Sequence, residues 1–173
     1  MGVTIDLDLE ARALRDAGML GRSGPMGNQL YAIDYSHLPP EAWRVIQLIM
    51  NGGPFDYPED DAKPFDNDFG DLPRQGEYLE FTVMTPGLPL RKKDRKPQRG
   101  RRRIVARRND ILFFTACHYE RVQGAMSDDE RRTQTALVDE QWRNGFYAIT
   151  GLSADMRGRI RDGVQRLFAR LTP

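Results

Sequence analysis

The strongest constraint in this sequence is an alternation of apolar and polar side chains over residues 77–85. Leu79, Phe81 and Val83 fall on one face of an extended segment, and Glu80 falls on the other face with a polar neighbour on either side. A period of two is the pattern of a β-strand that is buried on one face only. The segment therefore predicts a strand that packs its apolar face and presents a carboxylate on the opposite face.

Two further segments are suited to the same sheet. A Pro-Gly turn and a basic loop follow the first strand, and residues 101–105 and 111–119 contain the β-branched and aromatic side chains typical of strands. Strands that follow one another closely favour an antiparallel meander. In such a meander Glu80, Arg103 and His118 can project from one surface of the sheet.

These three side chains match the chemistry of RNA cleavage without a metal. A base takes the proton of the 2′-hydroxyl, an acid protonates the departing 5′-oxygen, and cations stabilise the charged phosphorane. A histidine in an aromatic strand is ordinarily a buried, hydrogen-bonded residue, but the upstream Glu80 and the arginines favour a catalytic role for His118. A nucleophilic Cys117 is disfavoured, because adjacent strand residues point to opposite faces.

The clearest helix is predicted over residues 38–52, with prolines at its start, Glu41 in its first turn and two glycines at its end. His37, just before it, is expected to be a capping or surface residue. The spacing i, i+3, i+4, i+7 indicates one buried face. That face consists of Ala42, Val45, Ile46 and Ile49.

Six segments, in this order, resemble the small bacterial guanyl-specific ribonucleases, barnase and its streptomycete relatives. They extend over residues 37–122, about half of the chain. The resemblance implies an α+β fold in which one main helix packs on an antiparallel sheet. The segments are Leu38–Ala42, Gly53–Tyr57, Phe65–Asn67 with Leu72–Pro73, Glu80–Gly87, Arg99–Ile104 and Thr115–Tyr119.

The resemblance also implies roles for the catalytic candidates. Glu80 corresponds to the general base and His118 to the general acid. Arg99 and Arg103 correspond to the arginines that stabilise the phosphate, with Arg101 as the alternative if the register shifts by one residue.

Further residues match substrate-binding positions of the same family. Arg102 corresponds to a third, more structural arginine, and Tyr119 to a tyrosine that lies against the phosphate or the base. The segment from Phe65 onward corresponds to the loop that recognises the base. Its candidate contacts are Phe65, Asp66, Asn67, Asp68 and Phe69.

Phe69 departs from the family pattern. It stands where the family has a glutamate that accepts hydrogen bonds from guanine, and Asp68 stands where an arginine is usual. A phenyl ring stacks on any base but accepts no hydrogen bond, so guanine preference is left open, with Asp66 or Asp68 as substitute acceptors. A calcium loop among the carboxylates of residues 59–71 is disfavoured, because their spacing lacks the ligand pattern of such loops.

Positive charge is concentrated in one stretch. Residues 91–108 hold eleven basic side chains and one acidic one, although the net charge of the chain is only +1. Residues 88–98 include about eight more than the streptomycete pattern, and their cations are expected to contact RNA phosphates in a salt-dependent way. The alternatives are a solvated loop, or contact with an acidic partner such as an inhibitor or the acidic N-terminal half of the chain.

The resemblance divides the chain into an N-terminal extension (1–36), a ribonuclease-like domain (37–123) and a helical C-terminal extension (124–173). A short helix is predicted near Leu9, and two more begin near Ser127 and Ser153. The last of these has an apolar stripe and an arginine-rich opposite face. The C-terminal extension is expected to cover the sheet, to dimerise, or to bind a carrier or inhibitor.

Together these features predict a metal-independent endoribonuclease that needs no cofactor and cleaves single-stranded RNA through a 2′,3′-cyclic phosphate. The alternative is a non-catalytic RNA-binding or regulatory protein that retains the fold. The resemblance suggests a secreted enzyme or a delivered toxin module held by an acidic inhibitor protein. No signal peptide is recognised in the sequence, so a cytoplasmic location stays open.

Overall fold

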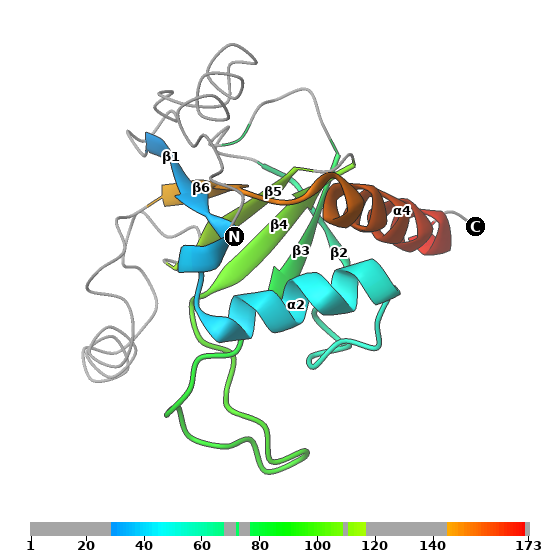
Figure 1. The fold of residues 1–173 in the computed structure, drawn as a ribbon. Helices are drawn as coiled ribbons and strands as arrows, with labels where there is room; N and C mark the ends of the chain where they lie inside the picture. Colours follow the sequence, from blue (N-terminus) through cyan, green and yellow to red (C-terminus); the bar gives the residue numbers. More distant parts are fainter. Residues whose placement is uncertain (1–28, 68–71, 73–76, 109–110, 117–144, 172–173) are drawn as a thin grey trace.

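The computed structural model describes residues 29–67, 72, 77–108, 111–116 and 145–171, and two helices cover one face of its six-stranded sheet (Figure 1). The strand order is β1-β6-β5-β4-β3-β2. The strands are β1 (Gln29–Asp34), β2 (Lys63–Phe65), β3 (Tyr78–Thr82), β4 (Arg103–Arg107), β5 (Leu112–Thr115) and β6 (Gly145–Thr150). The helical elements are the short 3₁₀ turn η1 (Tyr35–His37), α2 (Pro40–Asn51) and α4 (Ala154–Leu171).

The predicted meander is confirmed by the pairing of β3, β4 and β5. β3 pairs with β4, and β4 with β5, both antiparallel. The apolar face predicted for β3 is also confirmed, because Leu79 and Phe81 belong to the main hydrophobic core with the helices. Tyr78 lies on the other face, in a smaller apolar cluster. The alternation therefore determines which side of the sheet carries Glu80.

Helix α2 forms where its sequence signals place it. Pro39 and Pro40 stand at its start, and Glu41 lies in its first turn. It ends at Gly52, whose φ of 75° is the left-handed conformation that glycine adopts without strain. All four residues of the predicted apolar face are buried, together with Met50.

The structure builds parts of both predicted extensions into the same sheet and core. β1 pairs in parallel with β6, and β6 pairs antiparallel with β5. Helix α4 packs on α2, and the apolar stripe predicted for it is buried at Ile160, Val164, Leu167 and Phe168. Among the roles expected for the C-terminal segment, α4 covers the sheet. The helices predicted near Leu9 and Ser127 lie outside the described residues.

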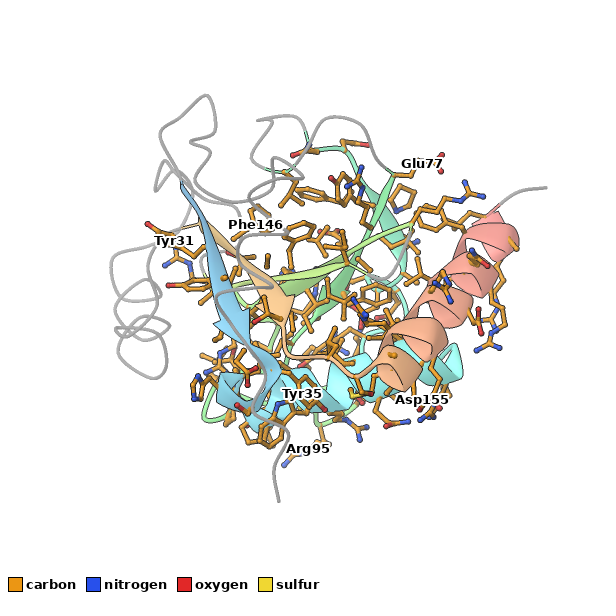
Figure 2. The ribbon with its side chains drawn as sticks, turned by 45° about the horizontal axis from the view of Figure 1, so that its top comes forward. Tyr31, Tyr35, Glu77, Arg95, Phe146 and Asp155 are labelled. Atoms are coloured by element: carbon orange, nitrogen blue, oxygen red, sulfur yellow. The ribbon has the colours of Figure 1, made fainter. Side chains whose placement is uncertain are left out.

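Close contact between the two helices depends on a glycine. A Cβ added at Gly163 would lie 2.0 Å from the main-chain oxygen of Ile49 in α2. Side chains from both helices and the sheet fill the space between them (Figure 2). The fold is thus α+β, as predicted, with two helices on one face of a mostly antiparallel sheet.

The opposite face of the sheet has an apolar end and a polar end. The apolar end is a cluster of Leu72, Tyr78, Val105, Phe113, Phe146 and Ala148, with Phe65 and Ile111 packed against it. At the polar end, Thr82 lies opposite Arg103, which in turn lies opposite Thr115. None of the helices in the described residues is both long and apolar enough to cross a membrane.

Candidate active site

Glu80 and Arg103 lie on the same face of the sheet, as the alternation predicted. Glu80 is half-buried in β3 between Lys63 of β2 and Val105 of β4. Arg103 lies opposite Thr82, two residues along β3, so Glu80 and Arg103 are diagonal neighbours. A carboxylate and a guanidinium are therefore placed next to each other on rigid strands.

Arg103 is almost completely buried and is held by the main chain. Its Nη1 donates to the carbonyl oxygens of Gly100 (2.7 Å) and Arg102 (2.8 Å). The main chain can pass this close to Thr85 because residue 100 is a glycine, since a Cβ there would lie 2.3 Å from Oγ1 of Thr85. The site thus contains a fixed positive charge, which suits the stabilisation of a developing anion.

Arg99 lies in the loop before β4, and its side chain contacts β3. Its Nε donates to Oγ1 of Thr82 at 2.9 Å, and its Nη1 lies 3.3 Å from Oδ1 of Asp60. The side chain of Arg99 is 26% exposed. Arg99 and Arg103, the two arginines that the resemblance marks for phosphate binding, thus lie next to Thr82.

Asp61 accepts a hydrogen bond from the main chain of Thr82, a role that was not predicted from the sequence. Its Oδ1 accepts from the main-chain N–H of Thr82 at 2.8 Å, and its Oδ2 accepts from that of Tyr57 at 3.4 Å. Burial raises the pKa of Asp61, while hydrogen bonds from Thr82 and Tyr57 and the charge of Arg99 oppose that rise. The place of Thr82 in the site could have been predicted, because the alternation puts it on the same face of β3 as Glu80.

The acidic loop, residues 56–61, uses its carboxylates in internal contacts. Glu59 accepts from Lys93, Asp60 faces Arg99, and Asp61 is bonded to Thr82. Among the described residues, no group of three or more His, Cys, Asp or Glu side chains is arranged to hold a metal ion.

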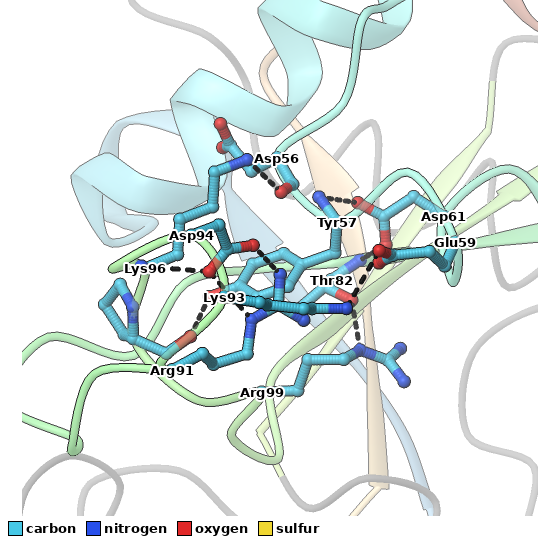
Figure 3. A network of polar contacts seen from close by, with 11 residues as sticks. Asp56, Tyr57, Glu59, Asp61, Thr82, Arg91, Lys93, Asp94, Lys96 and Arg99 are labelled. Atoms are coloured by element: carbon cyan, nitrogen blue, oxygen red, sulfur yellow. Dashed lines mark hydrogen bonds and ion pairs between the residues drawn. The ribbon is translucent and has the colours of Figure 1, made fainter.

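The basic insertion folds as a hairpin-like arm, here called the basic arm (residues 89–98). Its two sides are joined by hydrogen bonds from Arg91 to Lys96 (2.7 Å) and from Gln98 to Pro89 (2.8 Å) between main-chain atoms. The arm packs on the acidic loop, where the hydroxyl of Tyr57 donates to the carbonyl oxygen of Pro97 at 2.6 Å (Figure 3).

Three of the five cations of the basic arm are engaged within the protein. Lys93 pairs with Glu59 at 2.8 Å, Lys96 donates to the carbonyl oxygen of Asp56, and Arg91 pairs with Asp94. The side chains of Lys92 and Arg95 make no hydrogen bond or ion pair with any residue that the structure describes. Arg95 points outward from the molecule (Figure 2). Lys92 and Arg95 are therefore the two cations of the basic arm best placed for the predicted contacts with RNA phosphates.

Arg102 is not brought together with Glu80. Its side chain is buried, and its Nη1 lies 3.4 Å from Oε2 of Glu41, in the first turn of α2. That contact is on the side of the sheet that the helices cover. Arg101, the alternative to Arg99 and Arg103 if the register shifts, is half-buried.

The described part of the base-recognition segment is organised by Asn67. Its Nδ2 donates to the carbonyl oxygen of Leu72 (2.9 Å), and its Oδ1 accepts from the N–H of Leu72 (3.1 Å). Its φ of 52° is a left-handed conformation that asparagine tolerates better than most residues. The amide of Asn67 therefore ties together the two ends of the loop between residues 67 and 72.

Only some of the other predicted base-contact residues lie within the described part of the structure. Phe65 is the last residue of β2, and the centroid of its ring lies 6.3 Å from that of Tyr78 and 6.0 Å from that of Phe146. Asp66 is exposed. The remaining predicted site residues lie outside the described residues. These are Asp68, Phe69, His118 and Tyr119.

Comparison with known proteins assigns the family. A family model described as ribonuclease matches residues 24–125. The chain is 42% identical over 85 residues to guanyl-specific ribonuclease St of Saccharopolyspora erythraea, covering 48% of this chain and 75% of the relative. The chain belongs to the bacterial guanyl-specific ribonuclease family. As in the resemblance drawn from the sequence, the match includes Glu80 and the arginines of β4.

A second curated relative supports the same family assignment. Guanyl-specific ribonuclease Sa of Kitasatospora aureofaciens is 40% identical over 89 residues, covering 49% of this chain and 81% of the relative. A solved structure of ribonuclease Sa2 complexes with mononucleotides has a TM-score of 0.47 and 27% identity, covering 70% of this chain and 94% of that chain. The family match ends at residue 125, so β6 and α4 lie beyond it.

Proposed function

We propose that this ribonuclease family member is a metal-independent endoribonuclease that cleaves single-stranded RNA by transphosphorylation through a 2′,3′-cyclic phosphate. The observation that carries the proposal is the placement of Glu80 beside Arg103, with Arg99 bonded to Thr82 of the same strand. Binding of RNA alone does not require a carboxylate next to phosphate-binding arginines. A base in that position is what the transfer reaction needs.

The proposed reaction uses each group once in the first step. Glu80 takes the proton of the 2′-hydroxyl, and the 2′-oxygen attacks phosphorus. Arg99 and Arg103 stabilise the negative charge that develops on the phosphorane oxygens. His118 protonates the 5′-oxygen as its bond to phosphorus breaks, which leaves a 2′,3′-cyclic phosphate and a free 5′-hydroxyl.

Base choice is proposed to be less strict than that of an enzyme with a guanine-accepting glutamate. Asn67 is bonded to the main chain of Leu72, but Phe69 matches the position of the guanine-accepting glutamate and can offer only stacking. Sequencing of the fragments from a mixed-sequence RNA tests this point. Cleavage after guanosine alone would assign base recognition to another acceptor, such as Asp66, Asp68 or the main chain.

An inhibitor protein is a further part of the proposal. The arginines that bind RNA phosphates would also attract an acidic protein surface, and a secreted or delivered ribonuclease needs such protection in the cell that makes it. An inhibitor of this kind should compete with RNA, and added salt should weaken its inhibition.

The activity test uses purified protein, RNA and EDTA. Wild-type protein should produce fragments with 2′,3′-cyclic phosphate ends at the same rate with and without EDTA. Glu80→Gln and His118→Ala should each lower the rate by roughly 10²–10⁴-fold, the range of positioned acid–base groups, and both should still bind RNA.

Glu77→Gln is the matched control for Glu80→Gln. It removes the same charge, but Glu77 is exposed and pairs with Arg108. This control should cleave at the wild-type rate. Full activity of His118→Ala, or loss of wild-type activity in EDTA, would contradict the mechanism.

A further inference from the structure

Tyr57 connects the basic arm to the acidic loop close to the phosphate-binding arginines. Its side chain has no exposed surface, and its hydroxyl donates to the carbonyl oxygen of Pro97 at 2.6 Å. Pro97 lies two residues before Arg99. One partly buried hydrogen bond thus anchors the main chain two residues before Arg99.

The arm is held on the loop by contacts of complementary charge. The arm has five basic side chains and one acidic one, and the acidic loop has four carboxylates. The guanidinium of Arg91 lies over the ring of Tyr57 at 4.7 Å from its centroid, Lys93 pairs with Glu59, and Lys96 donates to the carbonyl oxygen of Asp56. These contacts dock the arm within the molecule.

The acidic loop reaches the same arginine from the other side. Asp61 accepts from the N–H groups of Tyr57 and Thr82, and Thr82 accepts from Nε of Arg99. Asp60 faces Nη1 of the same guanidinium. Figure 3 shows the contacts of Tyr57, Asp61 and Thr82 as one network from the arm to Arg99.

We propose that Tyr57 is a positioning residue for Arg99, and that the docked basic arm holds this arginine in place for catalysis. The proposal rests on the proposed ribonuclease function. A cation stabilises a transition state only when it is held where charge develops, and a long loop gives the following residue more freedom unless it is anchored. The anchor is the Tyr57–Pro97 hydrogen bond, supported by the contact of Lys96.

The first test measures turnover of a dinucleotide substrate, which is too short to reach the arm. Tyr57→Phe removes the hydroxyl and keeps the ring under Arg91. Its kcat should fall about tenfold, part of the 10²-fold that a misplacement of 1 Å can cause, with KM changed less than kcat. Tyr35→Phe is the control, because Tyr35 packs against Trp43 near the start of α2, and it should turn over like the wild type.

A double-mutant cycle separates positioning from a general loss of structure. If Tyr57 acts through Arg99, Tyr57→Phe should have no further effect in an Arg99→Ala protein. Lys96→Met tests the second anchor at a less buried position, and its effect should disappear in the same background.

The outcomes distinguish this inference from the proposed function. If the wild type leaves RNA intact in EDTA, the proposed function is wrong and the inference is wrong with it. If the wild type is active and Arg99→Ala is impaired, but Tyr57→Phe equals the wild type, the inference alone is overturned. An equal loss from Tyr57→Phe with and without Arg99 would also overturn it.

Discussion

The salt dependence of RNA binding should separate two sets of cations in the basic arm. The docking cations are Arg91, Lys93 and Lys96, which contact acidic side chains or main-chain oxygens of the protein. The tip cations are Lys92 and Arg95, which make no such contact within the described residues. A cation already held by a carboxylate or a carbonyl oxygen of the protein makes fewer phosphate contacts, and so it releases fewer of the counterions condensed on the RNA.

The expected slope follows from this count. For single strands, log K falls by roughly 0.7 for each phosphate contact per log unit of salt. Five phosphate contacts from the arm would contribute about 3.5 to the slope, and two contacts from the tip about 1.4. Lys92→Ser/Arg95→Ser should therefore flatten the slope by about 1.4. Lys93→Ser/Lys96→Ser should leave it nearly unchanged.

The assay is fluorescence anisotropy with a labelled single-stranded RNA. Both double variants are made in a Glu80→Gln protein, so that binding is measured without cleavage. Equal flattening by the two double variants would refute the reasoning, because it would show that the docking cations leave the acidic loop for RNA. No flattening by the tip variant would show that the arm faces away from RNA.

Other predictions concern the stability and shape of the fold. Gly163→Ala should destabilise the protein by about 1–3 kcal/mol or more, because its Cβ would meet the main chain of α2; Gly158→Ala, where the nearest atom is 3.7 Å away, should stabilise by roughly 0.5–1 kcal/mol. Thermal melts of the two variants check this, and a neutral Gly163→Ala would contradict the close packing of α4. Arg44→Met should lower stability at neutral pH by roughly 0.2–1 kcal/mol, because the hydrogen bond from Arg44 lowers the pKa of Asp56. A carboxylate whose pKa is lowered in the folded state stabilises the fold at pH values above its ordinary pKa. The difference in free energy of unfolding between the wild type and Arg44→Met, measured in urea, should therefore shrink as pH falls below about 4. A difference that stays constant with pH would contradict the ion pair. Asn67→Ala should lower kcat/KM by removing the two hydrogen bonds between Asn67 and Leu72, with little change in melting temperature, and an unaltered kcat/KM would show that base recognition does not depend on these bonds.

Much of the sheet and its chemistry follows from local sequence patterns. The alternation around Glu80 predicted the face it occupies, and the apolar spacing from Ala42 predicted the buried side of α2. β1 and β6 were not predicted, because they pair in parallel with each other across more than 100 residues of sequence. Periodicity carries no information about such distant partners.

The supporting contacts of the site were beyond sequence reasoning for a related reason. Asp61 was visible as one of several carboxylates, but its bonds to Thr82 and Tyr57 depend on how three segments meet in space. The resemblance gave Arg102 a more structural role among the substrate-binding residues, and its contact with Glu41 depends on how α2 lies against the start of β4. β5 ends at Thr115, so strand alternation does not determine where His118 points.

The position of β6 between β1 and β5 has a consequence for the order of folding. The meander of β3 to β5 joins neighbours in the chain, so the strands that carry Glu80 and Arg103 can form by local contacts. β1 comes first among the described strands, yet its neighbour in the sheet is β6, which is synthesised more than 100 residues later. Such non-local pairing closes a long loop and is intrinsically slow. The catalytic strands should thus assemble early, while the edge formed by β1, marked by the Tyr31–Tyr147 ring pair, is added last.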